Sequence, residues 1–176
     1  MRLQPVLVAM LLASLAGCST KIARVDMDGT RLVPSTTRAD QFLVLCDYRL
    51  GEVVDARHDG AEAGGLSAHA FTFRDAADVV RKQLLHVGVF DDPAVVAPTV
   101  SVHILQLYLT QNLETKVPVA VYRVTIGDEP AFVLRSQKAS LNWNGTEDEA
   151  YAAYARTMAD VTTQLVEQLN RRCHGR

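Results

Sequence analysis

The chain has 176 residues and a formal net charge of −2 at pH 7, from 18 basic and 20 acidic side chains. This length fits a single domain. The nearly balanced, slightly acidic composition gives no electrostatic reason to bind nucleic acid, so we exclude DNA and RNA from the expected partners.

The first residues have the pattern of a signal peptide. Arg2 supplies a positive charge, Val6 to Ala16 form an apolar run, and Gly17 provides a small residue beside a cleavage point. As a helix this run would rise only about 16 Å, against about 30 Å for the hydrocarbon core of a bilayer. We therefore predict a signal peptide over residues 1–17 rather than a transmembrane anchor.

The sequence Leu15-Ala16-Gly17-Cys18 resembles the lipobox of bacterial lipoproteins. The resemblance implies that the Cys18 sulfur carries a diacylglycerol, that the chain is cut before Cys18, and that the new amine is acylated. Three acyl chains exceed what stable membrane attachment needs. Ser19, where an aspartate would signal retention at the inner membrane, implies an outer-membrane anchor with the domain facing the periplasm. Apart from these covalent lipids we expect no cofactor.

Two further cysteines, Cys46 and Cys173, remain in the mature chain. An even pair in an oxidising compartment predicts a disulfide. The alternative is two buried thiols, because free cysteine behaves as a small hydrophobe.

The first half of the mature chain predicts a tether, a strand and a helix. Residues 18–40 are expected to form the lipidated tether with some short strand pairing, and residues 41–176 a single domain. Phe42 to Leu50 is apolar and rich in strand formers, which predicts a buried strand. A hairpin with a mobile Gly- and Ala-rich tip at Asp59 to Gly65 is expected next. Helical spacing of apolar residues then predicts a helix from Phe73 to Val87.

Residues 97–145 predict a curved, three-stranded meander. In the first strand, Val100, Val102 and Ile104 share one face, but the next leucines fall on the other face. A similar change of phase separates Val121 from Val124 in the second strand. Each change predicts a β-bulge or a strand whose two ends bury opposite faces.

The C-terminal region predicts a long helix. Thr146 and Glu149 have the spacing of a capping box, and Asn144-Gly145 turns the chain into it. A single apolar stripe follows at spacings of three and four residues, typical of a helix that packs on a sheet. Its members are Tyr151, Tyr154, Met158, Val161, Leu165 and Leu169. The expected fold is therefore α+β with two layers: an antiparallel sheet of about four to six strands packed against helices over Phe73–Val87 and Glu147–Arg171.

No motif in the sequence predicts catalysis or metal binding. The segment from Gly64 to His69 contains Ser67, but it lacks the closing glycine of a nucleophile elbow. The segment from Gly60 to Gly65 lacks the spacing of a phosphate-binding loop. No two histidines have a ligand spacing such as His-x-x-x-His, so we expect neither a metal site nor an enzyme. The histidines are His58, His69, His86, His103 and His174.

The order of elements resembles a group of small outer-membrane lipoproteins. A strand, a helix ending in Gly88-Val89-Phe90, a meander beginning "VSVHILQLYL" and a long final helix are similar to the lipopolysaccharide-assembly lipoprotein, the YajG-like lipoproteins and the auxiliary lipoproteins of ABC-type envelope transporters. The resemblance implies a non-enzymatic accessory or assembly factor whose partners are the membrane and another envelope protein. The exposed edge of the meander and the loop from Asp55 to His69 are the expected contact regions.

Two other functions stay open. A carrier of an apolar ligand would need a cavity between the sheet and the last helix, lined by Leu105, Leu107, Tyr154 and Met158. If these residues fill the core, that cavity does not exist. A small hydrolase would need Ser67 and His69 together with a third group that the sequence does not identify.

Overall fold

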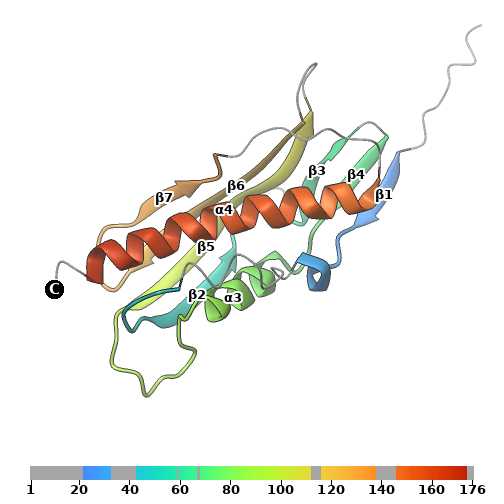
Figure 1. Cartoon of the computed structure of the whole chain (residues 1–176). Coiled ribbons are helices and arrows are strands. Elements are labelled where there is room, and N and C mark those ends of the chain that lie inside the picture. The colour runs from blue at the N-terminus through green and yellow to red at the C-terminus, as the bar shows by residue number, and fades with distance from the viewer. Residues whose placement is uncertain are drawn as a thin grey trace, which may run out of the picture.

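A computed structural model describes residues 22–32, 43–58, 60–66, 68–111, 116–137 and 146–173. The signal peptide, Cys18 and Ser67 lie outside the described residues. Two helices, α3 (Ala76–His86) and α4 (Glu147–Cys173), lie on one face of a sheet (Figure 1). The predicted two-layer α+β class is confirmed.

The sheet has seven strands in the order β1-β4-β3-β5-β6-β7, and β2 also pairs with β5. The strands are β1 (Ala23–Asp26), β2 (Arg49–Asp55), β3 (Glu62–Leu66), β4 (His69–Thr72), β5 (Thr99–Gln111), β6 (Lys116–Ile126) and β7 (Phe132–Arg135). β1 is parallel to β4, and β5 is parallel to both β2 and β3, so the sheet is mixed rather than purely antiparallel as predicted. Between β2 and β5 the chain runs through β3, β4 and α3, a connection long enough to bring the two strands together in parallel.

The antiparallel meander β5-β6-β7 is confirmed, and the two changes of phase have different causes. In β5, the register against β6 shifts between Ile104 and Gln106, which places a bulge at Leu105. β6 has no such interruption of its own. The face of β6 that carries Ala120, Tyr122, Val124 and Ile126 is buried in the core along the strand, and Val119 and Val121 are also buried on its other face.

α4 begins and packs as predicted. The Glu149 amide donates to Thr146 Oγ1 at 3.4 Å, and the Thr146 amide donates to Glu149 Oε2 at 3.3 Å, which is the reciprocal pattern of a capping box. The helix covers β5, β6 and β7, while α3 covers β2. The two helices are linked by the Thr162 hydroxyl, which donates to Gln83 Oε1 at 3.1 Å.

Two predicted local structures are wrong, and one predicted helix begins later than expected. Residues 43–48 do not form a strand; β2 begins only at Arg49. The Gly- and Ala-rich region is not a mobile hairpin tip, because Glu62–Leu66 forms β3 inside the sheet. The helix predicted from Phe73 begins at Ala76, three residues later. A short 3-10 helix, η1 (Gly29–Leu32), follows β1.

Candidate functional site

The N-terminal strand joins the domain at the end where α4 begins. The Asp28 amide donates to the Tyr151 hydroxyl at 2.7 Å. The Arg31 guanidinium contacts Glu147 at 3.2 Å and Asp148 at 2.5 Å, both in the first turn of α4. We call this the tether end, because residues 18–21 precede it in the sequence. In Figure 1, β1 and the start of α4 lie together, opposite the C-terminus.

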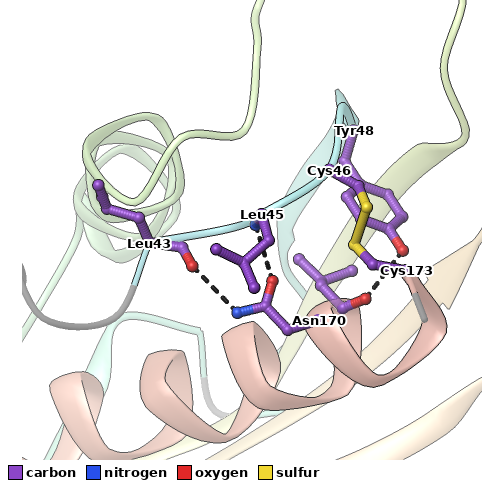
Figure 2. The surroundings of a disulfide bond; sticks show 7 residues. Leu43, Leu45, Cys46, Tyr48, Asn170 and Cys173 are labelled. Carbon is purple, nitrogen blue, oxygen red and sulfur yellow. Dashed lines mark hydrogen bonds between the residues drawn. A yellow bond between two sulfur atoms is a disulfide. The ribbon is translucent and has the colours of Figure 1, made fainter.

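The structure brings Cys46 and Cys173 together at the opposite end of α4 (Figure 2). Their sulfur atoms are within bonding distance and their Cα atoms are 5.9 Å apart, inside the usual disulfide range. From Tyr151 to Cys173 the helix rises by about 33 Å. The cysteine pair therefore lies far from the tether end, and we call this region the far end.

Residues 43–48 form an extended strap between the C-terminal ends of α3 and α4. Asn170 Oδ1 accepts from the Leu45 amide at 2.8 Å, and Asn170 Nδ2 donates to the Leu43 carbonyl at 3.0 Å (Figure 2). The Tyr48 hydroxyl donates to the Leu169 carbonyl at 3.0 Å. On the other side, the Val44 amide donates to the Val87 carbonyl at 2.9 Å. These contacts replace the strand pairing that the sequence predicted for this segment.

A groove of about 1160 Å³ lies near the tether end. In β4, Phe71 packs against Tyr154 of α4, so its neighbours Ala70 and Thr72 point to the other face of the sheet. Arg24 and Gly65 are both paired with Ala70 and share that face. The groove is lined by Ile22, Arg24, Glu62, Gly64, Gly65, His69, Ala70, Phe71, Thr72, Thr110 and Gln111.

The close approach of β3 to β5 in this groove depends on Gly64. Its φ is +81°, a conformation that costs other residues energy. A Cβ added there would collide with the backbone carbonyl of Leu109. Gly64 and Gly65, which were predicted to belong to a mobile tip, are therefore residues of β3 at a point of close backbone contact.

The structure places the residues of the two alternative functions as follows. His69 lines the groove, and its Nδ1 atom is buried without a hydrogen-bond partner among the described residues. Leu107, Tyr154 and Met158 are fully buried in the core cluster, whereas Leu105 lies half-buried at the bulge. These four residues therefore do not line one cavity, and the groove is on the other side of the sheet.

A buried arginine that the sequence analysis did not identify fills the break between β2 and β3. Its side chain is 4% exposed, and its guanidinium pairs with Asp55 at 2.5 Å. The same group donates to the carbonyls of Glu62 at 3.1 Å and Phe73 at 2.5 Å. This residue, Arg57, satisfies backbone groups where neither strand continues beside β5. Its sequence context, a Gly-rich segment, carries no signal of burial.

The positive charge of Arg57 acts on two buried tyrosines. Burial raises the pKa of Tyr122 and of Tyr154, and the nearby guanidinium opposes this effect for both. The Tyr154 hydroxyl donates to the Ala63 carbonyl, which ties α4 to β3. Within the part of the chain that the structure describes, the buried Tyr122 hydroxyl has no hydrogen-bond partner. Both tyrosines remain neutral at physiological pH and act as structural groups.

Among the described residues, no helix is both long and apolar enough to cross a bilayer. Nor do three His, Cys, Asp or Glu side chains gather as metal ligands within residues 22–32, 43–58, 60–66, 68–111, 116–137 and 146–173.

Comparison with known proteins gives a similarity of fold. No protein-family model and no curated protein sequence matches this chain. The structure is similar to that of protein XCC0632 from Xanthomonas campestris, described as a DUF330 protein, with a TM-score of 0.52, 8% identity, and coverage of 82% of this chain and 92% of that one. A second crystal structure, titled as an uncharacterized protein, gives a TM-score of 0.43, 13% identity and coverage of 87% and 99%. The similarity to XCC0632 shows the fold alone, and the YajG-like resemblance stays a prediction.

Proposed function

We propose that this protein is a non-enzymatic accessory lipoprotein, anchored through Cys18 to the outer membrane, that binds another protein of the cell envelope. The observation that carries this proposal is the separation of two ends in one rigid domain. β1 joins the domain where α4 begins, and the cysteine pair lies about 33 Å away at the other end of that helix.

The tether contributes to binding through concentration. Residues 19–21 are the only ones between the lipidated cysteine and Ile22, the first described residue. Such a short tether confines the domain close to the membrane, so membrane-bound partners meet it at high effective concentration. A weak interface is then sufficient for stable association.

Affinity capture tests this proposal. The tagged full-length protein would be crosslinked in living cells and purified from the envelope, beside a Cys18→Ala variant present at the same level. We expect one envelope protein in stoichiometric amount with the wild type and much less with the variant. Recovery of the wild type without any protein partner would contradict the proposal.

A second candidate function is the binding of an amphiphile in the groove near the tether end. The groove volume is close to that of sites for small ligands, and its lining combines Ile22 and Ala70 with Arg24. This carrier function predicts that a lipid is extracted with the purified protein in stoichiometric amount. An Ala70→Leu substitution, which narrows the groove, would then reduce the lipid recovered.

A further inference from the structure

β1 is the terminal strand of the sheet, and among the described residues only its inner side is paired (Figure 1). On that side, the amides of Ala23 and Met27 each donate at 2.7 Å to a carbonyl within residues 68–72. The N–H and C=O of one strand residue point to the same side, and successive residues alternate between the two sides. The backbone groups of Arg24 and Asp26 therefore point outward, away from β4.

The two edges of the sheet differ in what covers them. At β7, the Arg135 carbonyl accepts from Gln164 Nε2 of α4 at 3.0 Å, so the last helix covers part of that edge. Within the described ranges, no hydrogen bond reaches the backbone groups of Arg24 and Asp26. The side chains of both residues are exposed. Unpaired edges of this kind can add a strand from another chain.

The sequence of β1, Ala-Arg-Val-Asp, is self-complementary in one antiparallel register. When two copies lie antiparallel with Val25 opposite Val25, Arg24 of each copy lies opposite Asp26 of the other. The outward backbone groups of these residues then meet as hydrogen-bonded pairs, each exchanging two bonds. Sliding one strand by two residues in either direction places two arginines or two aspartates opposite each other, which is unfavourable. The charges therefore select a single register.

The contacts around this edge leave room for the added ion pairs. Asp26 accepts from the Thr72 hydroxyl at 2.8 Å and pairs with Arg74 at 3.1 Å, whereas Arg24 has no partner among the described residues. A carboxylate has about four acceptor positions, so Asp26 can accept from a second guanidinium. Pairing would place it between Arg74 of its own chain and Arg24 of the other copy. Glu62, which pairs with Thr72 one strand further in, offsets the extra positive charge.

The opposite face of β1 offers a small apolar contact. Val25 is half-buried and is paired with Phe71, which packs against Tyr154 of α4. In the register above, the two Val25 residues face each other at a non-hydrogen-bonded position, where Cα atoms lie about 4.5 Å apart. Each valine would cover the exposed part of the other.

A contact between two four-residue strands is small, and the membrane anchor compensates for its size. Stable interfaces between freely diffusing proteins bury about 1,200–2,000 Å², more than such a strand pair provides. Lipidation at Cys18 would confine the copies to one membrane and raise their effective concentration. A two-fold axis relates the copies, so both tethers start at the same height above a membrane normal to that axis. We propose, on the basis of this anchor, that β1 pairs with β1 of a second copy of this chain in the antiparallel register centred on Val25.

Cysteine crosslinking tests the register. Val25→Cys would be introduced into the full-length protein in its own envelope and oxidised mildly, beside Ala23→Cys, Val133→Cys and the wild type. The Cα separation at Val25 lies within the disulfide range, whereas the two Ala23 residues are about 13 Å apart. Val133 is exposed on β7 and reports random collisions. We expect a disulfide-linked dimer with Val25→Cys, about tenfold less with either other variant, and none with the wild type.

Charge substitutions test the ion pairs in the Val25→Cys background. Arg24→Glu places like charges opposite each other in both pairs, so the dimer yield should fall about tenfold. Arg24→Glu combined with Asp26→Arg and Arg74→Glu inverts the whole set of charges, so the yield should recover. Arg123→Glu makes the same change at an exposed position on β6 and should leave the yield unchanged. An unchanged yield with Arg24→Glu would overturn the proposal.

A distance measurement covers the case in which Val25→Cys does not fold. The lipidated protein with a nitroxide on Ile22→Cys would be reconstituted in vesicles of phosphatidylethanolamine and phosphatidylglycerol. Ile22 is exposed, and the register places the two copies of this residue about 20 Å apart. Pulsed electron paramagnetic resonance should show this distance, and Arg24→Glu should abolish it. Absence of the distance in anchored, folded protein would overturn the proposal.

The crosslinked products separate this inference from the proposed function. A Val25→Cys disulfide with a different envelope protein would overturn the pairing of two copies and leave the accessory function standing. Equal dimer yields with Val25→Cys and Val133→Cys would likewise overturn the pairing alone, because the accessory function depends on a different protein recovered by affinity capture.

Discussion

Cys46 and Cys173 are separated by 127 positions in the sequence, yet their Cα atoms lie 5.9 Å apart. Cys46 belongs to the strap, and Cys173 is the last residue of α4. A covalent bond between them would join the strap to the C-terminal end of α4.

The first prediction concerns this pair. We expect protein purified from the cell envelope without reductant to contain no free thiol at either position. The chain-entropy model gives about 5 kcal/mol of stabilisation for a loop of this length. Intact-mass analysis after alkylation of the folded protein checks the bond. Two alkylated cysteines in folded, unreduced protein would show that the alternative of two free thiols is correct.

The second prediction concerns Asn170, which bonds both Leu43 and Leu45. Asn170→Ala removes two hydrogen bonds and should lower the free energy of unfolding by about 1 to 3 kcal/mol. Asn170→Asp keeps an acceptor for the Leu45 amide but turns a carboxylate oxygen toward the Leu43 carbonyl, so it should destabilise the protein at least as much as Asn170→Ala. Urea denaturation followed by circular dichroism measures both. A clearly smaller loss with Asn170→Asp than with Asn170→Ala would contradict the bond from Asn170 Nδ2 to the Leu43 carbonyl.

The third prediction concerns Arg57. Arg57→Ala removes the ion-pair partner of Asp55. It also removes the guanidinium that donates to the carbonyls of Glu62 and Phe73. Breaking a buried pair in this way costs about 3 to 5 kcal/mol. Arg24→Ala serves as control, because Arg24 is exposed and should change the free energy of unfolding by less than about 0.5 kcal/mol. Similar midpoints for the two variants would refute the structural role of Arg57.

The fourth prediction compares two glycines with positive φ, Gly60 at +61° and Gly64 at +81°. A Cβ at Gly60 meets open space, so Gly60→Ala should cost only the backbone term of about 1 to 2 kcal/mol. Gly64→Ala adds a collision with Leu109, worth about 1 to 3 kcal/mol more. Thermal melts of the two variants give the order, and a Gly60 variant less stable than the Gly64 variant would contradict it.

The fifth prediction concerns the anchor. Cys18→Ala removes the lipidated sulfur that the lipobox resemblance implies, so the variant should leave the outer-membrane fraction. Fractionation of the envelope with mass analysis of the N-terminus measures this directly. A variant that stays membrane-bound and is cut at the same position would show that the lipobox prediction is wrong.

The meander and α4 could be predicted because their signals are local. The capping box at Thr146 and Glu149 and the apolar stripe of α4 lie within one continuous segment. The change of phase in β5 was likewise visible in the alternation around Leu105. In such segments, the spacing of apolar residues predicts which face of the helix or strand is buried.

The features that were not predicted depend on contacts distant in sequence. The strap has the composition of a strand, but its backbone groups are satisfied by Asn170 and by the end of α3. The parallel pairing of β2 with β5 follows from the path of the chain through α3, which alternation cannot reveal. Burial of Arg57 depends on a gap between two strands, and nothing in the residues around it marks that gap.

The central claim is that the domain acts by binding a partner from its membrane anchor, without chemistry. Complementation of a deletion strain, scored by permeability of the envelope, tests it most directly. The account predicts full rescue by Ser67→Ala and poor rescue by Cys18→Ala at equal protein levels. Loss of rescue with Ser67→Ala, in protein that is folded and membrane-bound, would contradict the account and favour a hydrolase.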